Sequence, residues 1–502
     1  MLVPVPAWSS PENRRRPAED EEFLRIVSEP LPLRRMRRSP RIPLAPAQER
    51  MWHAAQAGLS GDWNIARAFR IRGQAVNVSA LTAALEDVVR RHTPLRTCYP
   101  PALDGPIQVV VDADFARLDV RVVDTFTGRL AGQLAEFSSY AFDLATELPI
   151  RARVFRLGQR DVVLALVTHH ISVDGASIGP LMRDLVTAYL ARAAGHAPDW
   201  PPLPVDYVDY TLWKHEYLGD FDDPYSRASA QLRYWAINLA GRPTPLEFPY
   251  DRPRPARPDT TGDTVAVRFD ADLHRDLLAR ARACGSSLFL LLQTAFALSV
   301  AAFANSRDVT VATAVSGRDD PLLADLVGNL ADDVLMRIRL HRTADLVELL
   351  DQVRRVGLAA FAHPDTPNPR LQRCLPQDPS HPLFQATLIL QRADAAPAAA
   401  AEVGELSVTE LPTGVVRAKH DLEFGLTEHY DQTGAAAGID GPFRYPVARF
   451  DRETAERFVE KFTATVVLIA SGYDGPIEPL LSSTSRRRAR RPQRCRSPRE
   501  NS

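Results

Sequence analysis

The most informative segment of this 502-residue chain is Val167-Thr168-His169-His170-Ile171-Ser172-Val173-Asp174-Gly175-Ala176-Ser177. The residues just before it, 161–168, are mostly apolar and are typical of a buried strand. After it, apolar residues recur at the helical spacing i, i+3, i+4, i+7, at Ile178, Leu181, Met182, Leu185, Val186, Tyr189 and Leu190. The pattern therefore predicts that two adjacent histidines lie where a strand ends and a helix begins.

The residue types at this junction suit acyl transfer. His170 can act as a base near neutral pH, because the unperturbed pKa of histidine is about 6.5. The amide of Gly175 and the free N–H groups of the following helix favour developing negative charge. A single histidine is more often a packed or solvated side chain, but a His-His pair followed at this spacing by Asp-Gly rarely arises by chance.

The segment resembles the His-His-x-x-x-Asp-Gly signature of condensation domains of nonribosomal peptide synthetases, which belong to the chloramphenicol acetyltransferase-like superfamily. The likeness extends in order from about Pro43 to about Leu480. Other motifs that match the family are Leu44-Ala45-Pro46-Ala47-Gln48-Glu49-Arg50-Met51-Trp52, Arg91-His92-Thr93-Pro94-Leu95-Arg96-Thr97, Tyr207-Val208-Asp209-Tyr210-Thr211-Leu212-Trp213, Ser316-Gly317-Arg318 and Lys419-His420-Asp421-Leu422-Glu423-Phe424.

Two segments and one single residue depart from the family pattern. Residues 327–333 read Val-Gly-Asn-Leu-Ala-Asp-Asp where the family usually has Gly-x-Phe-Val-Asn-Thr. Residues 363–369 read His-Pro-Asp-Thr-Pro-Asn-Pro in place of His-Gln-Asp-x-Pro-Phe-Glu, and Ala176 replaces a common tryptophan. These departures leave the base and the turn intact and bear on the choice of substrate and on activity.

The resemblance implies an α/β fold, with two chloramphenicol acetyltransferase-like lobes in a V-shaped arrangement and the active site in the channel between them. Five segments are expected along the chain. They are a disordered leader (1–40), an N-terminal lobe that carries the His-His motif (41–240), a proline-rich connector (241–263), a C-terminal lobe (264–481) and a disordered arginine-rich tail (482–502).

Two local expectations come from the pattern alone. Ser79 is expected to cap a helix whose apolar positions include Leu81, Leu85 and Val88. Residues 287–304 carry no charge and approach the length of a membrane span. Because Gln293, Thr294 and Ser299 interrupt this segment and no second span accompanies it, it is expected to be a buried core helix.

Charge and cysteine content exclude several classes of function. Of the net charge of −1, residues 486–502 contribute +7 from eight arginines and Glu500, so residues 1–485 carry −8. A mildly acidic body argues against a nucleic-acid-binding face, and no signal or membrane segment is apparent. The four cysteines, Cys98, Cys284, Cys374 and Cys495, have no metal-like spacing. The chain is expected to be cytoplasmic, with no bound metal.

The resemblance assigns separate roles within the motif. His170 is expected to be the base or the group that positions the amine, with the Gly175 amide beside it. His169 is expected to be structural, since adjacent strand residues point to opposite faces. Asp174 is expected to pair with Arg318 of the second lobe and to hold the turn, and Ser177 to cap the helix through a first-turn amide.

Asp332, Asp333 and Ala176 are expected to line the channel. If either carboxylate faces the channel, it should favour a substrate that carries positive charge. The alternative is that both carboxylates point to solvent or cap the neighbouring strand. The residue pattern leaves these two interpretations open.

The family resemblance implies a condensation-type acyltransferase of secondary metabolism, such as antibiotic biosynthesis. It would transfer an acyl, aminoacyl or peptidyl group from a carrier-protein thioester to an amine, or less often to a hydroxyl. The phosphopantetheine would belong to a carrier protein acting in trans, and no cofactor would be bound by the chain itself. Two alternatives are a non-catalytic recruiting domain of the same fold and an acyl-CoA-dependent O-acyltransferase.

Overall fold

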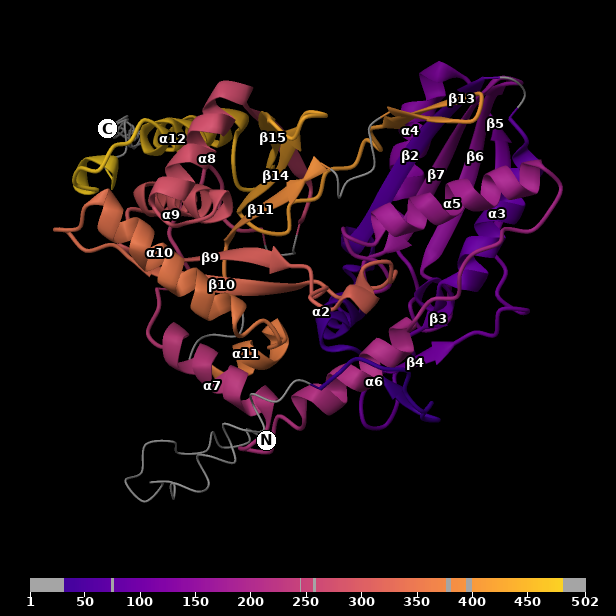
Figure 1. Ribbon diagram of the computed structural model, residues 1–502, viewed down its shortest axis with the longest axis horizontal. Helices are drawn as coiled ribbons and strands as arrows, with labels where there is room; N and C mark the ends of the chain where they lie inside the picture. The colour runs from indigo at the N-terminus through magenta and orange to yellow at the C-terminus, as the bar shows by residue number, and fades with distance from the viewer. Residues whose placement is uncertain are drawn as a thin grey trace, which may run out of the picture.

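The computed structural model describes residues 31–73, 76–243, 245–255, 259–375, 381–393 and 400–481. These residues form two α/β lobes, each built around a six-stranded sheet. Figure 1 shows the lobes side by side, with α2 (Pro46–Gln56) at their junction. The mixed α/β class and the two lobes expected from the sequence are therefore confirmed.

The N-terminal lobe is a sheet covered by helices on both faces. Alternate residues of its central strand β7 enter two different cores: Val162, Leu164 and Leu166 pack with α3 and α5, while Val163, Ala165 and Val167 pack with α2 and α4. A strand buried on both faces must be apolar throughout, which explains the continuous apolar run before the histidines. The strand order is β12-β13-β2-β7-β6-β5. The elements are β2 (Asn64–Gly73), β5 (Val120–Asp124), β6 (Ile150–Gly158), β7 (Asp161–His169), α3 (Val78–Arg91), α4 (Thr127–Ser138) and α5 (Ile178–Ala193).

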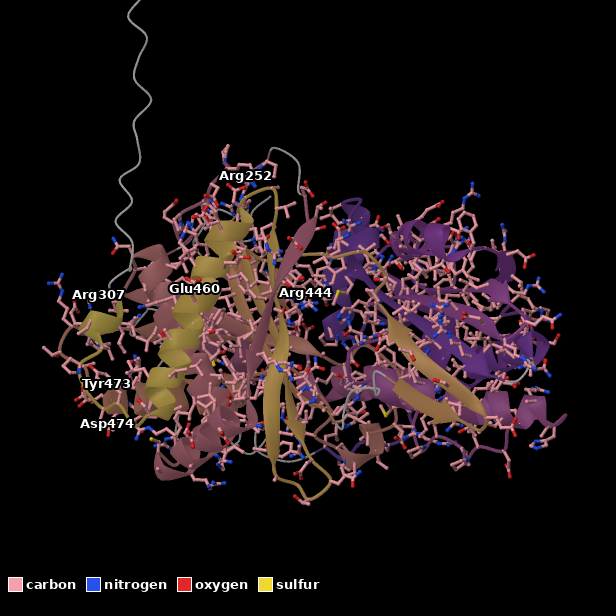
Figure 2. The ribbon with its side chains drawn as sticks, turned by 90° about the horizontal axis from the view of Figure 1, so that it is seen from above. Arg252, Arg307, Arg444, Glu460, Tyr473 and Asp474 are labelled. Atoms are coloured by element: carbon pink, nitrogen blue, oxygen red, sulfur yellow. The ribbon has the colours of Figure 1, made fainter. Side chains whose placement is uncertain are left out.

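The C-terminal lobe packs its helices against one face of its sheet. On β14, Leu422, Phe424 and Leu426 enter this core, while the alternate residues Glu423 and Gly425 lie on the opposite, half-buried face. The strand order is β10-β9-β11-β14-β15-β8. The elements are β8 (Gly262–Phe269), β9 (Asp308–Val315), β10 (Asp332–Arg339), β11 (Ala386–Arg392), β14 (Leu422–Tyr430), β15 (Ala436–Pro446), α7 (Arg227–Leu239), α8 (Ala271–Ala283), α9 (Leu288–Ala304), α10 (Leu346–Phe361), α11 (Asn368–Cys374) and α12 (Arg452–Ala470). Figure 2 shows the two lobes from above, with α12 on the outer side of the C-terminal lobe.

A third, small sheet and a 12-residue helix lie near the junction of the lobes. The sheet has the order β1-β4-β3, and its strands are β1 (Ile42–Pro43), β3 (Thr97–Cys98) and β4 (Ile107–Val110). The helix is α6 (Tyr207–Leu218). Tyr207 and Tyr210 of α6 are buried against Leu323, Leu326 and Leu330 of the second lobe. These aromatic residues therefore belong to a core that both lobes share.

One hairpin crosses from the second lobe to the first. Strands β12 (Ala400–Val403) and β13 (Leu406–Leu411) follow β11 in the chain, yet β13 pairs antiparallel with β2, from Leu406 opposite Gly73 to Leu411 opposite Ala68. In Figure 1 the orange β13 lies among the indigo and purple strands of the N-terminal lobe. The expected range of the second lobe therefore contains a segment that completes the sheet of the first.

The buried helix expected at 287–304 is confirmed as α9, whose N-cap Ser287 accepts a hydrogen bond from the N–H of Leu290. The expected cap at Ser79 was wrong, because the cap lies two residues earlier: helix α3 begins at Val78, and Asn77 accepts from the N–H of Ala80. An Asn side chain serves as an N-cap as well as a serine does. No single described helix is long and apolar enough to cross a membrane, although α8 and α9 together, bent by 99°, pass the same test of length and composition.

The expected connector and termini fall partly within the described residues. Helix α7 ends at Leu239 and β8 begins at Gly262, and the described residues between them form no helix or strand apart from an isolated bridge between Thr261 and Arg417. The expectation of disorder was wrong for residues 31–40. Leu33 is buried, and the Met36 N–H donates to Asp209 of α6. Residues 1–30 and the expected tail, 482–502, lie outside the described residues.

We predict that Gly73→Ala will weaken the crossing hairpin. Gly73 has φ +149°, and a Cβ there would lie 2.6 Å from the carbonyl oxygen of Glu405. The strained backbone should cost about 1–3 kcal/mol, and the clash with β13 should add to that. The measurement is the urea midpoint of unfolding. Gly58→Ala is the control, because Gly58 has φ +79° and no atom within 4 Å of the added Cβ. Equal losses in the two variants would contradict the close approach of β13 to β2.

Candidate active site at the end of strand β7

The two histidines of the motif lie at the end of β7, and their side chains point to opposite faces of the sheet. The N–H of His169 donates to the Pro149 carbonyl at 2.9 Å, and the N–H of His170 donates to the Trp63 carbonyl at 2.8 Å. These bonds fix the backbone on both sides of the strand end. Because neighbouring side chains of an extended strand point to opposite faces, only one of the two rings can face the second lobe.

His169 faces into the N-terminal lobe. Its side chain is completely buried, its Nδ1 accepts the N–H of Ile171 at 3.1 Å, and its ring meets Phe142 edge-on at 6.1 Å. Burial, with the nearby charge of His170 adding to it, lowers the pKa of His169 to about 3. His169 is therefore a neutral side chain that helps to shape the turn, in keeping with its expected structural role.

His170 is half-buried and lies beside Trp63, the last residue of the 3-10 helix Ser60–Trp63. The two rings meet edge-on with centroids 6.0 Å apart. Nδ1 of His170 is buried and has no hydrogen-bond partner among the described residues, which leaves Nε2 as the nitrogen available to a ligand. Burial and then the positive charge of Lys419 lower the pKa of His170 below its ordinary value, so the ring is neutral at physiological pH.

Gln48 of α2 clamps the turn that follows the histidines. Its side chain is completely buried; Nε2 donates to the Ile171 carbonyl at 2.9 Å, and Oε1 accepts the N–H of Ala45 at 2.9 Å. The Ser172 hydroxyl lies 2.7 Å from the hydroxyl of Tyr99 and completes the clamp. The sequence motif contained Gln48 but gave no signal that this residue reaches the histidine turn.

Asp174 joins the two lobes through a single carboxylate that is completely buried. Its Oδ1 accepts from the N–H of Ser177 at 2.9 Å, inside the turn. Its Oδ2 lies 2.7 Å from Nη1 of Arg318 and also accepts the N–H groups of Leu330 and Ala331 at 3.0 and 3.2 Å. The ion pair expected from the resemblance is therefore present, and backbone amides of the second lobe reinforce it.

Ser177 was expected only to cap helix α5, but its hydroxyl bonds to residues of the second lobe. It occupies the N-cap position of α5, but its hydroxyl makes no bond to a first-turn amide. Instead its oxygen lies 2.8 Å from Oδ1 of Asp174 and 2.8 Å from the Gly328 carbonyl, and it accepts from the Gly328 N–H and from Nη2 of Arg318. The expected cap bond was therefore wrong, because these partners occupy the hydroxyl.

Gly175 lies at the exposed tip of the turn and faces the second lobe. A Cβ at this position would meet only Nε2 of Gln391, at 3.9 Å. Gln391 belongs to β11 and is exposed. The N–H of Gly175 has no acceptor among the described residues, so it is free to donate to a ligand. Ala176, next to it, is half-buried. Nothing in the sequence motifs pointed to Gln391.

Of the two carboxylates, Asp333 is paired with a cation, whereas Asp332 makes one local hydrogen bond among the described residues. Asp333 forms an ion pair with Arg50 of α2, and Nδ2 of Asn368 lies 3.4 Å from it. Asp332 accepts the N–H of Asp333 at 2.8 Å, and its enclosure raises its pKa to about 7. Asp333 is therefore already neutralised by a neighbour, which removes the basis for expecting it to attract a cationic substrate.

Lys419 is the nearest lysine to the histidines. Its Nζ lies 4.0 Å from the centroid of the Trp63 ring, whose edge meets His170. Burial lowers the pKa of Lys419 to about 8, and the nearby charge of Glu423 opposes this shift. Within the described residues, no group of three or more His, Cys, Asp or Glu side chains is arranged to hold a metal ion.

We predict that losing either partner of the Asp174–Arg318 pair will cost about 3–5 kcal/mol in free energy of unfolding, because an unpaired charge remains in a buried site. Asp174→Ala and Arg318→Ala should both show this loss by urea denaturation. Arg121→Ala is the control, since the Arg121–Asp119 pair is exposed and should contribute less than about 1 kcal/mol. A loss no larger than that of the control would show that the lobes do not depend on this pair.

We also predict that Asp332→Asn stabilises the protein more as the pH rises. The pKa of Asp332 is raised from 3.8 to about 7 in the folded state, so folding favours its protonated form. The carboxyl therefore costs no stability below its unfolded pKa; the cost grows as the pH rises from the unfolded pKa toward 7 and is constant above the folded pKa. The difference in melting temperature between Asp332→Asn and wild type should grow steadily from about pH 4 to about pH 7 and level off at higher pH. A difference that does not change with pH would contradict the raised pKa.

A family model for the condensation domain matches residues 39–489 of this chain. The chain is 40% identical, over 87% of its length, to a probable non-canonical nonribosomal peptide synthetase, CymA, of Salinispora arenicola. It is 37% identical, over 91% of its length, to an isonitrile lipopeptide synthase of Mycobacterium tuberculosis. The chain spans only 6% and 18% of the lengths of these two relatives.

Solved structures give the same result. The X-domain from teicoplanin biosynthesis is 31% identical with a TM-score of 0.82, covering 89% of this chain and 99% of that one. A complex of that X-domain with OxyB matches at 30% identity and the same TM-score, over 90% of this chain and 98% of that one. The starter condensation domain of rhizomide synthetase RzmA, at 18% identity and a TM-score of 0.70 over 87% and 96%, shows the fold alone. The chain therefore belongs to the condensation-domain family of nonribosomal peptide synthetases.

Proposed function

We propose that the chain is a condensation-type acyltransferase that joins a carrier-bound acyl or aminoacyl thioester to an acceptor amine, or less often a hydroxyl. The observation that carries this proposal is the neutral, half-buried His170 at the end of β7, with the unengaged N–H of Gly175 on the same turn. A neutral imidazole can accept a proton, and a free amide can donate to an oxyanion. Both devices lie on one rigid turn that the Asp174 network fixes.

In the proposed reaction, the acceptor nitrogen attacks the thioester carbonyl carbon. Nε2 of His170 accepts the proton that the nitrogen loses as the C–N bond forms. The N–H of Gly175 stabilises the negative charge that develops on the carbonyl oxygen. When the C–S bond breaks, the pantetheine sulfur leaves and takes up a proton. The charge therefore balances without a metal or a nucleotide.

The thioester would be presented by a carrier protein or carrier domain whose phosphopantetheine arm is part of the substrate. The family is that of nonribosomal peptide synthetase condensation domains, and one relative named above is a probable non-canonical nonribosomal peptide synthetase, which makes a carrier the natural donor in a pathway of secondary metabolism. The acceptor would be a small molecule or a second carrier-bound residue. No cofactor held by the chain itself enters the proposed reaction.

A second candidate function is recruitment of a partner enzyme without acyl transfer. It is favoured by one observation, the match at 31% identity to the teicoplanin X-domain, for which a structure of a complex with OxyB is also known. The departures at residues 327–333 and 363–369 are compatible with either function. The two candidates differ in one measurable way, because a recruiting domain gives no product even when loaded carriers and amines are supplied.

We predict that His170→Ala lowers acyl transfer by about 10²–10⁴-fold, the usual contribution of a positioned general base. The measurement is intact-mass analysis of loaded carrier proteins incubated with an acceptor amine and the purified chain. His196→Ala is the control, because His196 is exposed and, among the described residues, its ring bonds only to the carbonyl of Ala197. The control should retain full activity.

Two results would overturn the proposal. Turnover by His170→Ala equal to that of the wild type would remove the histidine from the mechanism. No product from the wild type across a panel of loaded carriers, together with stoichiometric binding of a partner enzyme, would favour recruitment instead. Circular dichroism and the melting temperature of His170→Ala would show whether a loss of activity reflects unfolding.

A further inference from the structure

Positive charge gathers on the side of the C-terminal sheet that faces His170. Gln391 of β11 approaches Gly175 of the first lobe, so its side of the sheet faces the turn. In the parallel pairing of β11 with β14, Gln391 lies opposite Thr427 and Ile389 lies opposite Gly425. Side chains at paired positions share a face, so Glu423 and Gly425 face the same way as Gln391. This face is called the inner face below.

Three cations lie at or beside the inner face. Lys419 stands over Trp63, as described above. The guanidinium of Arg444, on β15, crosses the sheet at Gly425, where an added Cβ would lie 3.1 Å from its Nη1. Figure 2 shows Arg444 near the middle of the molecule, where the two lobes meet in that view. Arg50, the third cation, lies 4.9 Å from the Trp63 ring.

The carboxylates nearby are too few to neutralise these cations. Asp333 is paired with Arg50, which cancels one charge of each sign. Glu423 is the cross-strand neighbour of Arg444 and the carboxylate whose charge most raises the pKa of Lys419, and its Oε1 already accepts the N–H of His420 at 2.6 Å. Among the described residues, neither Lys419 nor Arg444 has a carboxylate oxygen within 4.0 Å. Within the part of the chain that the structure describes, Lys419 and Arg444 therefore have only Glu423 nearby besides the paired Asp333, and one oxygen of Glu423 already bonds to a backbone N–H.

We propose that Lys419, with Arg444 behind it, forms a subsite for a carboxylate carried by one of the two substrates close to its reacting atom. This inference rests on the acyl transfer proposed above and goes beyond it by naming the substrate class. A half-buried cation without a partner is costly unless a ligand supplies the opposite charge. Lys419 and His170 both contact Trp63, so a carboxylate held by Lys419 lies beside the reacting centre.

The position of the subsite favours a carboxylate over the phosphate of the carrier's arm. That phosphate lies at the far end of the pantetheine chain from the sulfur, whereas Lys419 is separated from His170 by one indole ring. A carboxylate on the acceptor amine or on the acyl group would lie within reach of both residues. The carboxylate could thus belong either to the acceptor or to the acyl donor. Separate pairs of acceptor and donor substrates distinguish these two sources.

Transfer rates test the subsite through matched substrates that differ only in charge. The acceptor pair is glycine and glycinamide, and the donor pair is a succinyl carrier and the corresponding terminal amide. Lys419→Met should lower kcat/KM for the carboxylate member of one pair by about tenfold or more relative to its amide member. Lys419→Arg should restore much of the preference. Lys461→Met is the control, because Lys461 lies on α12, on the outer side of the lobe.

A second readout does not depend on turnover. The chain has only three lysines, Lys214, Lys419 and Lys461. Lys214 is paired with Asp365, so Lys461 serves as the internal reference for Lys419. Reductive methylation followed by peptide mapping should modify Lys419 more slowly in the presence of N,N-dimethylglycine, or of a succinyl pantetheine amide, than with the uncharged amide of the same probe. Labelling of Lys461 should not change.

The outcomes separate the two proposals. Equal losses of kcat/KM for the carboxylate and amide members in Lys419→Met would overturn the subsite while leaving acyl transfer intact. Absence of turnover in the wild type would count against the proposed function. In that case protection of Lys419 by a carboxylate probe would still support the subsite, and equal labelling rates with charged and uncharged probes would overturn it.

Discussion

The carboxylate of Asp174 holds the site together, because it is completely buried and groups of both lobes bond to it. One oxygen closes the turn after β7 through Ser177, and the other binds Arg318 and two backbone amides of the second lobe. The turn carrying Gly175 therefore cannot shift without breaking contacts to the second lobe. Gly328 shows how tight this junction is, since a Cβ there would lie 2.1 Å from Cδ2 of Tyr207.

The electrostatics around His170 follow from the same junction. Burial and the charge of Lys419 both disfavour protonation of the ring, which keeps the imidazole in the form that accepts a proton. The cations at this junction are only partly neutralised: Asp333 pairs with Arg50, and Glu423 is the one carboxylate beside both Lys419 and Arg444 among the described residues. A neutral base beside surplus positive charge suits a reaction in which negative charge develops on the substrate oxygen.

Local patterns in the sequence predicted much of this arrangement, and long-range contacts account for what they missed. The apolar run of β7, the helical stripe of α5 and the buried helix α9 follow from periodicity, and the motif resemblance supplied the pairing of Asp174 with Arg318. The crossing of β13 to β2, the clamp by Gln48 and the approach of Gln391 to Gly175 depend on residues far apart in the chain. The ion pair of Asp333 with Arg50 likewise joins distant segments, so the sequence could not show that this carboxylate is already occupied.

The central claim is that a turn fixed by both lobes presents His170 as a neutral base. Nitrogen-15 NMR of histidine-labelled protein, with His170→Ala used to assign the resonance, measures its protonation directly. The account predicts that the His170 imidazole remains neutral down to a pH well below 6. Titration of this ring with a pKa of 6.5 or above would contradict the account, since burial and the charge of Lys419 would then not lower the pKa of His170.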